Sequence, residues 1–388
     1  MKIKKLNQKG FAHWIMPAIV IVIIAAIGTY VLTASHADTP KQWSGWQLVT
    51  TPHGPIPTTQ TPAASAVPGT NTINLAFNIA NSGNNIGWTS SNQGSNWTNV
   101  HSITPDSALV WPAALSRSSG TTLLYASPPY GSFSAAQKLI LNSNGSAGSA
   151  WQNDNNTAAI SQGTGPALTN LNSGSYAEYF IPASNQNNNP TNIYQIICVS
   201  FYSCAPEQSI TLGANQSGSN GYYASDLKGI AAATTADGIT HVFVTVNATT
   251  VNNSVMGVIA EQSSTSAVSS STTSNWSGTG IVNGRSIVSP SAPAAVAVGN
   301  SIYLFIRGSD GHNYEAIHTP GSNGGTWSSW QLLGGNDLAV SQTRDYWGNS
   351  TPQEPGISAT VYGTGATGDD IALYTVGTDG NIYQDLLR

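Results

Sequence analysis

The sequence predicts an all-β chain: a β-propeller of about six four-stranded blades, preceded by one N-terminal transmembrane or signal helix. One local pattern occurs six times, with a Pro or Gly, a short strand of small residues, a break, and a run rich in β-branched and aromatic residues. No segment after residue 33 shows sustained helical periodicity. The six copies begin at PAASAV (Pro62), PAALSR (Pro112), PALTNL (Pro166), GIAAAT (Gly229), PAAVAV (Pro293) and PGISAT (Pro355).

The fifth copy shows the strands of one blade most clearly, as PAAVAV, SIYLFIRG, HNYEAIHT and WSSWQLLG. Ser309-Asp310-Gly311 is typical of the tight hairpin that joins the second strand to the third. The sixth copy has only three strands, and its missing fourth strand matches WSGWQLV at Trp43–Val49. We therefore expect the ring to close by pairing of this N-terminal strand with the C-terminal blade. Five or seven blades are alternatives because residues 184–229 are irregular, and an open solenoid is another, although it leaves the split repeat unexplained.

The first 42 residues carry the pattern of an export segment. Nineteen uncharged residues from Trp14 to Leu32 come close to the roughly 20 that span a membrane, and the lysines before them orient the rest of the chain outward. The expected divisions are a basic cytoplasmic leader (1–10), a transmembrane or signal-anchor helix (11–33), a short linker (34–42) and the propeller domain (43–388).

Three fates are open for this segment. If it is retained, the protein is a single-pass membrane protein that contacts the membrane through residues 14–32 and holds its C-terminal domain outside. Ser35-His36-Ala37 has the small residues that a signal peptidase prefers, so cleavage after Ala37 would give a secreted protein. Lys9-Gly10-Phe11 resembles the processing site of type IV prepilins, but the usual Glu is replaced by Ile15.

Charge disfavours nucleic acid as a partner, and none is expected. Only 7% of the residues are charged, where about 25% is typical. Four of the twelve basic residues lie in the first ten positions, so from Asp38 onward eight bases stand against seventeen acids, a net charge of −9. An acidic surface has no electrostatic attraction for phosphate backbones or anionic lipid headgroups.

Cys198 and Cys204 are the only cysteines, and they lie six residues apart. An oxidising compartment would let them form a disulfide that closes one small loop. Metal binding is the weaker hypothesis, because two thiols without a nearby His or carboxylate cannot complete a tetrahedral site. We expect no metal and no cofactor.

The last two copies carry a resemblance to known proteins. The strings FIRGSDGHNYEA, YTVGTDGNIYQD and WSSWQLLGG resemble the repeats of bacterial propeller lectins of the fucose-binding type and of related tachylectin-like propellers. The resemblance covers residues 293–388 and 43–49, about a quarter of the chain, and survives only as spacing across residues 70–284. It implies sugar-binding pockets between adjacent blades, and it makes Arg307 and Tyr314 candidates for ligand contact.

The residues themselves also favour a neutral, hydroxyl-rich ligand, because aromatic faces stack on the C–H surfaces of sugars while polar side chains bond the sugar oxygens. For the tryptophans, packing between blades is the competing hypothesis, and Asp310 and Asp379 are expected to be turn residues. The expected partners are glycans on host or neighbouring cells, or envelope polymers. The candidate ligand-binding residues are Trp43, Trp46, Arg307, Tyr314, Trp327, Trp330 and Tyr383.

The sequence predicts no catalysis. Ser90–Trp97 resembles the Asp-box of sialidases with Asn92 in place of Asp, but that box is a structural hairpin. The glutamates fall in unrelated contexts, whereas glycosidases need a pair of carboxylates. The seven histidines show no ligand spacing, and His312 and His318 are expected at the surface. A structural or protein-interaction propeller at the cell surface, or a sialidase-like hydrolase, are the alternatives to a lectin.

Overall fold

The computed structural model divides the chain into two compact units, Met1–Gln42 and Trp43–Arg388, and every element below belongs to the second. The helix predicted at 11–33 lies outside the described residues. Within the described residues, no helix combines the length and apolarity needed to cross a membrane. The structure describes residues 41–58, 60–80, 82, 85–105, 111–127, 137–153, 165–172, 174–181, 192–211, 224–249, 255–269, 275–283, 287–321, 325–333, 355–364 and 370–388.

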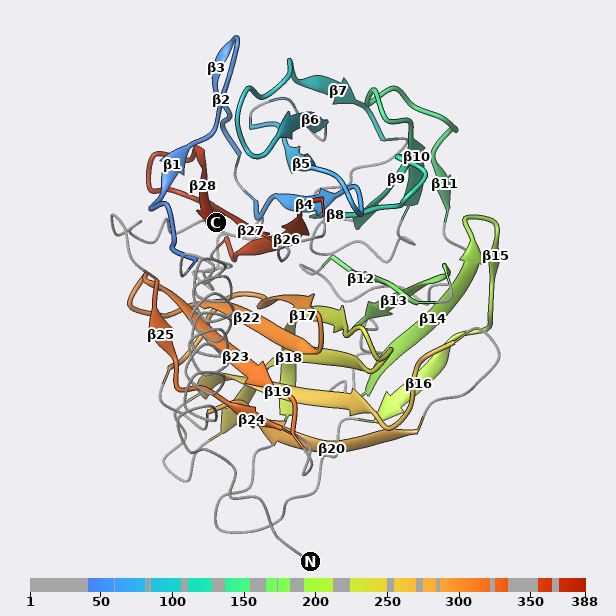
Figure 1. Ribbon diagram of the computed structural model, residues 1–388, viewed down its shortest axis with the longest axis vertical. Helices are drawn as coiled ribbons and strands as arrows, with labels where there is room; N and C mark the ends of the chain where they lie inside the picture. The colour runs from blue at the N-terminus through green and yellow to red at the C-terminus, as the bar shows by residue number, and fades with distance from the viewer. Residues whose placement is uncertain are drawn as a thin grey trace, which may run out of the picture. The chain divides into compact units, whose positions relative to one another are not determined.

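In these ranges the strands form six antiparallel sheets of four or five strands, which we number as blades 1 to 6, and one two-stranded hairpin (Figure 1). Blade 1 consists of β4 (Ala63–Ala66), β5 (Thr72–Asn78), β6 (Ile86–Asn92) and β7 (His101–Ile103). Blade 2 consists of β8 (Trp111–Ser116), β9 (Thr122–Ser127), β10 (Gln137–Leu141) and β11 (Gln152–Asn153). Blade 3 consists of β12 (Ala167–Asn170), β13 (Tyr176–Phe180), β14 (Asn192–Ser200), β15 (Ser203–Cys204) and β16 (Gln208–Thr211).

The C-terminal half of the chain supplies the other three blades. Blade 4 consists of β17 (Ala224–Thr234), β18 (Thr240–Thr249), β19 (Val255–Ser264) and β20 (Trp276–Ile281). Blade 5 consists of β21 (Ala294–Val298), β22 (Ser301–Arg307), β23 (Asn313–Thr319), β24 (Thr326–Trp327) and β25 (Gln331–Leu332). Blade 6 consists of β26 (Ser358–Tyr362), β27 (Asp370–Val376), β28 (Ile382–Leu387) and β1 (Gln47–Leu48), and a separate hairpin joins β2 (Thr50–Thr51) to β3 (Gly54–Pro55).

The first strand of each blade lies beside the first strands of its two neighbours, and β26 lies beside β4, so the inner strands form a closed ring. Their small side chains permit this close approach: Ser65 Oγ is 2.9 Å from Ser116 Oγ. Gly229 shows the same constraint, because a Cβ there would lie 2.4 Å from the Cα of Ala292. The prediction of an all-β propeller with six blades is confirmed.

The core of the propeller lies between the blades. Each of the six hydrophobic clusters among the described residues combines side chains of two adjacent blades. Between blades 4 and 5, for example, Phe243 and Ile259 pack with Ile302 and Leu304, and all four are at most 2% exposed. Full burial of one such side chain contributes about 1.5–3 kcal/mol. Each blade is therefore held in place mainly by hydrophobic packing against the two blades beside it.

The Asp-Gly pairs form the hairpins that the sequence predicts. Gly311 has a φ of 86° and Gly380 a φ of 74°, which glycine adopts without steric cost. Asp310 accepts a hydrogen bond from the backbone N–H of His312 at 3.1 Å, and Asp379 accepts one from Asn381 at 3.0 Å. Both aspartates are turn residues.

The fourth strand of blade 5 differs from the prediction, because WSSWQLLG is not one strand but the two short strands β24 and β25. The break occurs at Ser328, whose Oγ accepts a hydrogen bond from the backbone N–H of Ile317 at 2.9 Å, in place of a backbone carbonyl. The segment at Trp43 has the same geometry on β28: the Oγ of Ser44 accepts the N–H of Leu386 at 3.1 Å. Gln47 of β1 pairs with Gln384.

Candidate functional site

A contact of three side chains recurs between blades, and we call it the inter-blade triad. It combines an aromatic residue on the second strand of one blade, a Glu or Gln directly opposite on the third strand, and a Trp from the outer segment of the following blade. The four triads are Tyr179, Gln195 and Trp276 (blades 3 and 4); Phe243, Glu261 and Trp327 (blades 4 and 5); Phe305, Glu315 and Trp43 (blades 5 and 6); and Tyr374, Gln384 and Trp97 (blades 6 and 1).

The geometry of the four triads is nearly constant. The Trp ring meets the aromatic ring edge to face, with ring centroids 5.7 to 5.9 Å apart and interplanar angles of 81° to 87°. Such aromatic pairs contribute about 0.5–1.5 kcal/mol beyond the area that they bury. The tryptophans of these triads therefore hold neighbouring blades together.

Two triads contain a carboxylate in place of an amide. The indole Nε1 of Trp327 donates to Oε2 of Glu261 at 2.9 Å. At the next interface, burial raises the pKa of Glu315, and the hydrogen bond from Trp43 offsets part of this rise. Both pairs bring an acidic group and an indole together at a blade interface.

Two histidines join the triad between blades 4 and 5, and we call Glu261, Trp327, His241 and His318 the histidine–glutamate cluster. His241 Nδ1 lies 2.7 Å from Oε1 of Glu261. The ring of His318 lies 5.4 Å from that of His241 and 5.2 Å from that of Trp327, between centroids. A carboxylate, two imidazoles and an indole thus converge at one interface.

The cluster is close to the surface. The side chains of His241 and Glu261 are 9% and 15% exposed, and Trp327 is half-buried. Part of the surface of these three side chains therefore reaches solvent. Carboxylate and imidazole groups can accept or donate hydrogen bonds, and the indole supplies an aromatic surface.

The structure places all four predicted tryptophans at blade interfaces. Trp327 and Trp43 belong to triads. Trp330 packs against the core between blades 4 and 5, and Trp46 against the core between blades 5 and 6. All four are half-buried, so each has both a packing role and some exposed surface.

Arg307 does not face solvent. It is 1% exposed, and its Nη1 donates to the carbonyls of Pro355 and Val376 at 3.3 and 3.1 Å and to Oγ1 of Thr375 at 3.4 Å. These acceptors belong to blade 6 or the segment before it. These contacts give Arg307 a role in joining blades 5 and 6, and the ligand contact that the resemblance implied stays a prediction.

The two predicted tyrosines brace the Asp-Gly turns. The hydroxyl of Tyr314 donates to Oδ2 of Asp310 at 2.6 Å, and that of Tyr383 donates to Oδ2 of Asp379 at 3.1 Å. Both rings are half-buried, and neither belongs to a triad. Tyr314 also packs against the hydrophobic core between blades 4 and 5, as Trp327 does.

Sequence reasoning missed the polar members of the cluster. His318 was expected at the surface but is 7% exposed, because it faces His241 and Trp327 across the blade interface. Glu261 was not a candidate, since its partner Trp327 lies 66 residues away in the chain. The one available signal was register: Phe243 opposite Glu261 repeats Phe305 opposite Glu315.

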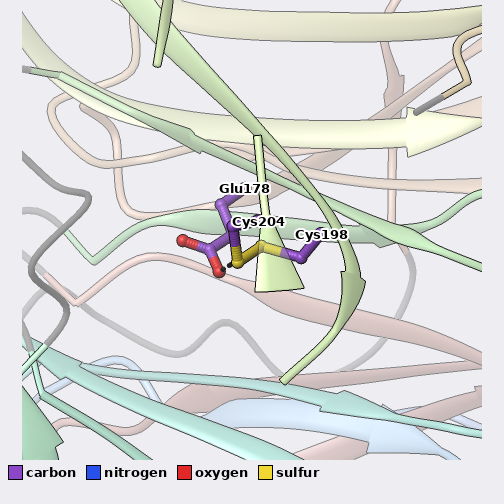
Figure 2. A group of neighbouring side chains, drawn as sticks. All are labelled: Glu178, Cys198 and Cys204. Atoms are coloured by element: carbon purple, nitrogen blue, oxygen red, sulfur yellow. Dashed lines mark hydrogen bonds between the residues drawn. A yellow bond between two sulfur atoms is a disulfide. The ribbon is translucent and has the colours of Figure 1, made fainter. Parts of the chain in front are cut away.

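A second group of polar side chains lies within blade 3. Cys198 and Cys204 form a disulfide, and Glu178 of β13 lies beside it (Figure 2). Glu178 Oε1 is 3.5 Å from Cys198 Sγ and accepts a hydrogen bond from the hydroxyl of Tyr125 in blade 2. Burial raises the pKa of Glu178 to about 8.

Comparison with known proteins supports the fold alone. No family model and no curated protein sequence matches the chain. Among solved structures, AofleA from Arthrobotrys oligospora is 13% identical with a TM-score of 0.56, covering 91% of this chain and 88% of its own. An α-L-arabinanase from Penicillium chrysogenum, complexed with arabinobiose, is 12% identical with a TM-score of 0.55, covering 89% of this chain and 98% of its own. The SapL1 lectin, in complex with α-methyl fucoside, is 12% identical with a TM-score of 0.44, covering 83% of this chain and 94% of its own.

Proposed function

We propose that this propeller is a lectin-like protein that binds neutral carbohydrate between blades 4 and 5. The observation that carries the proposal is the histidine–glutamate cluster, where the half-buried Trp327 lies beside Glu261 and two imidazoles. A sugar presents a C–H face that stacks on indole and hydroxyls that bond to carboxylate and imidazole. The net charge of −9 and the carboxylate of Glu261 disfavour acidic sugars.

The arrangement supports binding in preference to hydrolysis. Glycosidases use two carboxylates, about 5–9.5 Å apart. Within the described residues, the contacts of this cluster include only one carboxylate, Glu261, and His241 and Trp327 already engage it. Among the inner strands as described, only β17 contains acidic or basic residues, Asp226 and Lys228.

A glycan array tests the proposal, with binding of the wild-type chain compared with that of Trp327→Ala. We expect the substitution to weaken binding about tenfold or more, because stacking on an aromatic ring contributes about 0.5–1.5 kcal/mol and Glu261 loses its donor. Trp276→Ala is the matched control, since it removes the same triad position beside Gln195.

A blank array with folded wild-type protein would overturn the lectin proposal in favour of an interaction scaffold. Equal loss in both variants would show that a Trp at this position serves only the fold. Turnover of a fluorogenic glycoside by the wild-type chain, abolished by Glu261→Gln, would replace binding with hydrolysis. A resolved difference between Trp327→Ala and Trp276→Ala supports the site.

We also propose that the chain is exported, anchored through residues 14–32, and closed by its own N-terminal strand. The positively charged leader and the uncharged run support export. Closure is supported by the contacts of the segment on β28: Ser44 N–H donates to Leu386 O and Val49 N–H to Ile382 O, both at 2.9 Å. The membrane segment would then lead directly into the closing blade.

Two truncations separate these proposals. A chain that begins at Asp38 is expected to leave the membrane fraction while keeping the thermal unfolding temperature of the full chain. A chain that begins at Thr50 is expected to lose roughly 3 kcal/mol or more of unfolding free energy, because it lacks the fully buried Val49 and the contact of Trp43 with Phe305. Equal stability of the two truncated chains would contradict closure, and membrane retention of the Asp38 chain would contradict the anchor.

A further inference from the structure

Three groups that can bind a metal meet inside blade 3. Glu178 lies on β13, Cys198 on β14 and Cys204 on β15, and their ligand atoms all lie within 4.8 Å of one another. Figure 2 shows one carboxylate oxygen of Glu178 next to the disulfide. The two cysteines have no carboxylate or His partner close in the sequence, but the fold supplies that partner from a neighbouring strand.

The carboxylate of Glu178 is not fully satisfied where it lies. Glu178 is only 1% exposed, and its Oε1 accepts a hydrogen bond from the hydroxyl of Tyr125. Its Oε2 is buried and, among the described residues, has no hydrogen-bond partner. A buried polar atom without a partner costs about 1–3 kcal/mol, so a cation at this position would remove a penalty.

We propose that reduction of the disulfide converts this cluster into a site for one soft divalent cation of the Zn²⁺ class, held by Cys198, Cys204 and Glu178. As described, the two sulfurs are bonded to each other and cannot both bind an ion. The site therefore exists only in the dithiol state.

The redox step balances with a dithiol or a phosphine as reductant. The reductant supplies two electrons, the S–S bond breaks, and two thiols form, while a dithiol reductant becomes a disulfide or a phosphine becomes its oxide with oxygen from water. The cation then displaces the two thiol protons and the carboxyl proton to water. Because the cation holds both sulfurs, it also opposes re-formation of the disulfide.

The ligand set selects the metal. Thiolates favour Zn²⁺ and similar soft ions over Ca²⁺ and Mg²⁺, which prefer oxygen ligands. Tetrahedral Zn²⁺ with Zn–S distances of about 2.3 Å needs its two sulfurs roughly 3.8 Å apart, a separation that the broken disulfide can reach by side-chain rotation. Three protein ligands leave the fourth position for water.

The site can be reached from the surface through the β14–β15 hairpin. Cys204 is half-buried, whereas Cys198 is fully buried, and Tyr202 between them in the chain is 71% exposed. A reductant and an ion therefore approach Cys204 first. Because Cys198 pairs with Cys204 across this hairpin, opening the disulfide leaves both sulfurs on neighbouring strands.

Co²⁺ is the spectroscopic probe that tests the proposal in the full chain. After reduction with a phosphine, we expect about one Co²⁺ per chain with a thiolate-to-cobalt charge-transfer band, displaced by one equivalent of Zn²⁺, and no band in the oxidised chain. Glu178→Gln is expected to weaken the affinity for Co²⁺ about tenfold or more, because losing even an outer-shell partner of a metal site typically costs about 10–100-fold. Glu315→Gln is the matched control, because it alters a buried carboxyl in a different blade, blade 5. This variant should bind Co²⁺ as the wild type does.

Four outcomes would overturn the inference. They are no charge-transfer band in the reduced wild type, unchanged affinity in Glu178→Gln, the same band in a Cys198→Ser, Cys204→Ser double variant, or a reduced chain that loses its near-ultraviolet circular dichroism and does not recover it with Zn²⁺. The circular dichroism of each variant before metal addition separates loss of a ligand from loss of the fold.

Discussion

Replacing Trp97 with alanine is expected to lower the unfolding free energy by about 3–5 kcal/mol. Trp97 is 4% exposed and packs edge to face on Tyr374 of blade 6, with ring centroids 5.8 Å apart. The substitution leaves a cavity in the core between blades 6 and 1. This is the interface at which the first and last blades of the ring meet, so a loosened contact there weakens closure as well as packing.

Chemical denaturation of the full chain measures the effect, and Trp97→Phe is the comparison. The indole Nε1 of Trp97 has no hydrogen-bond partner among the described residues, so phenylalanine removes ring area without breaking a bond. We expect Trp97→Phe to cost clearly less than Trp97→Ala. If the alanine variant unfolds at the wild-type denaturant concentration, Trp97 is not an anchor of the ring.

The blade count could be predicted because each blade carries a recognisable local sequence pattern. A Pro or Gly and small residues mark each inner strand, since that strand must approach its neighbours closely, and the β-rich run follows within a few residues. Blade 3 was harder, because the Cys198–Cys204 hairpin divides its outer part into β15 and β16. The break of the blade 5 outer strand at Ser328 also escaped prediction, since it depends on a side chain that replaces a backbone acceptor.

The candidate site was only half predictable. Trp43 and Trp327 were found because the WSxWQL repeat is visible in the chain. Glu261 and His241 meet Trp327 only when blade 5 packs on blade 4, and no local pattern encodes that contact. For Arg307 a resemblance gives a residue type and position but not its burial against the next blade.

The pH dependence of stability gives the second large effect, and it depends on Glu178. Burial raises the pKa of this carboxyl from its ordinary 4.5 to about 8 in the folded protein. Below pH 4.5 both the folded and unfolded states hold the proton, so the stabilising contribution of the protonated group is fully present. Between pH 4.5 and 8 only the unfolded state has released it, so each pH unit removes up to about 1.4 kcal/mol of unfolding free energy.

Urea unfolding of the oxidised chain at pH 5, 6.5 and 8 is therefore expected to show stability falling with pH, by a total on the order of 4 kcal/mol from this group. The Glu178→Gln variant has no titrating proton at this position, so it should lose the slope. Its unfolding free energy should therefore fall less between pH 5 and pH 8 than that of the wild type. Glu207→Gln, which removes an exposed carboxylate from the same blade, is the control for a change of surface charge. An unchanged slope in Glu178→Gln would mean that Glu178 ionises freely, and the buried carboxyl beside the disulfide would then have to find solvent or a counter-charge in the folded state. Because Tyr125 and the disulfide surround the carboxyl and burial is the cause of its raised pKa, we expect the slope to disappear.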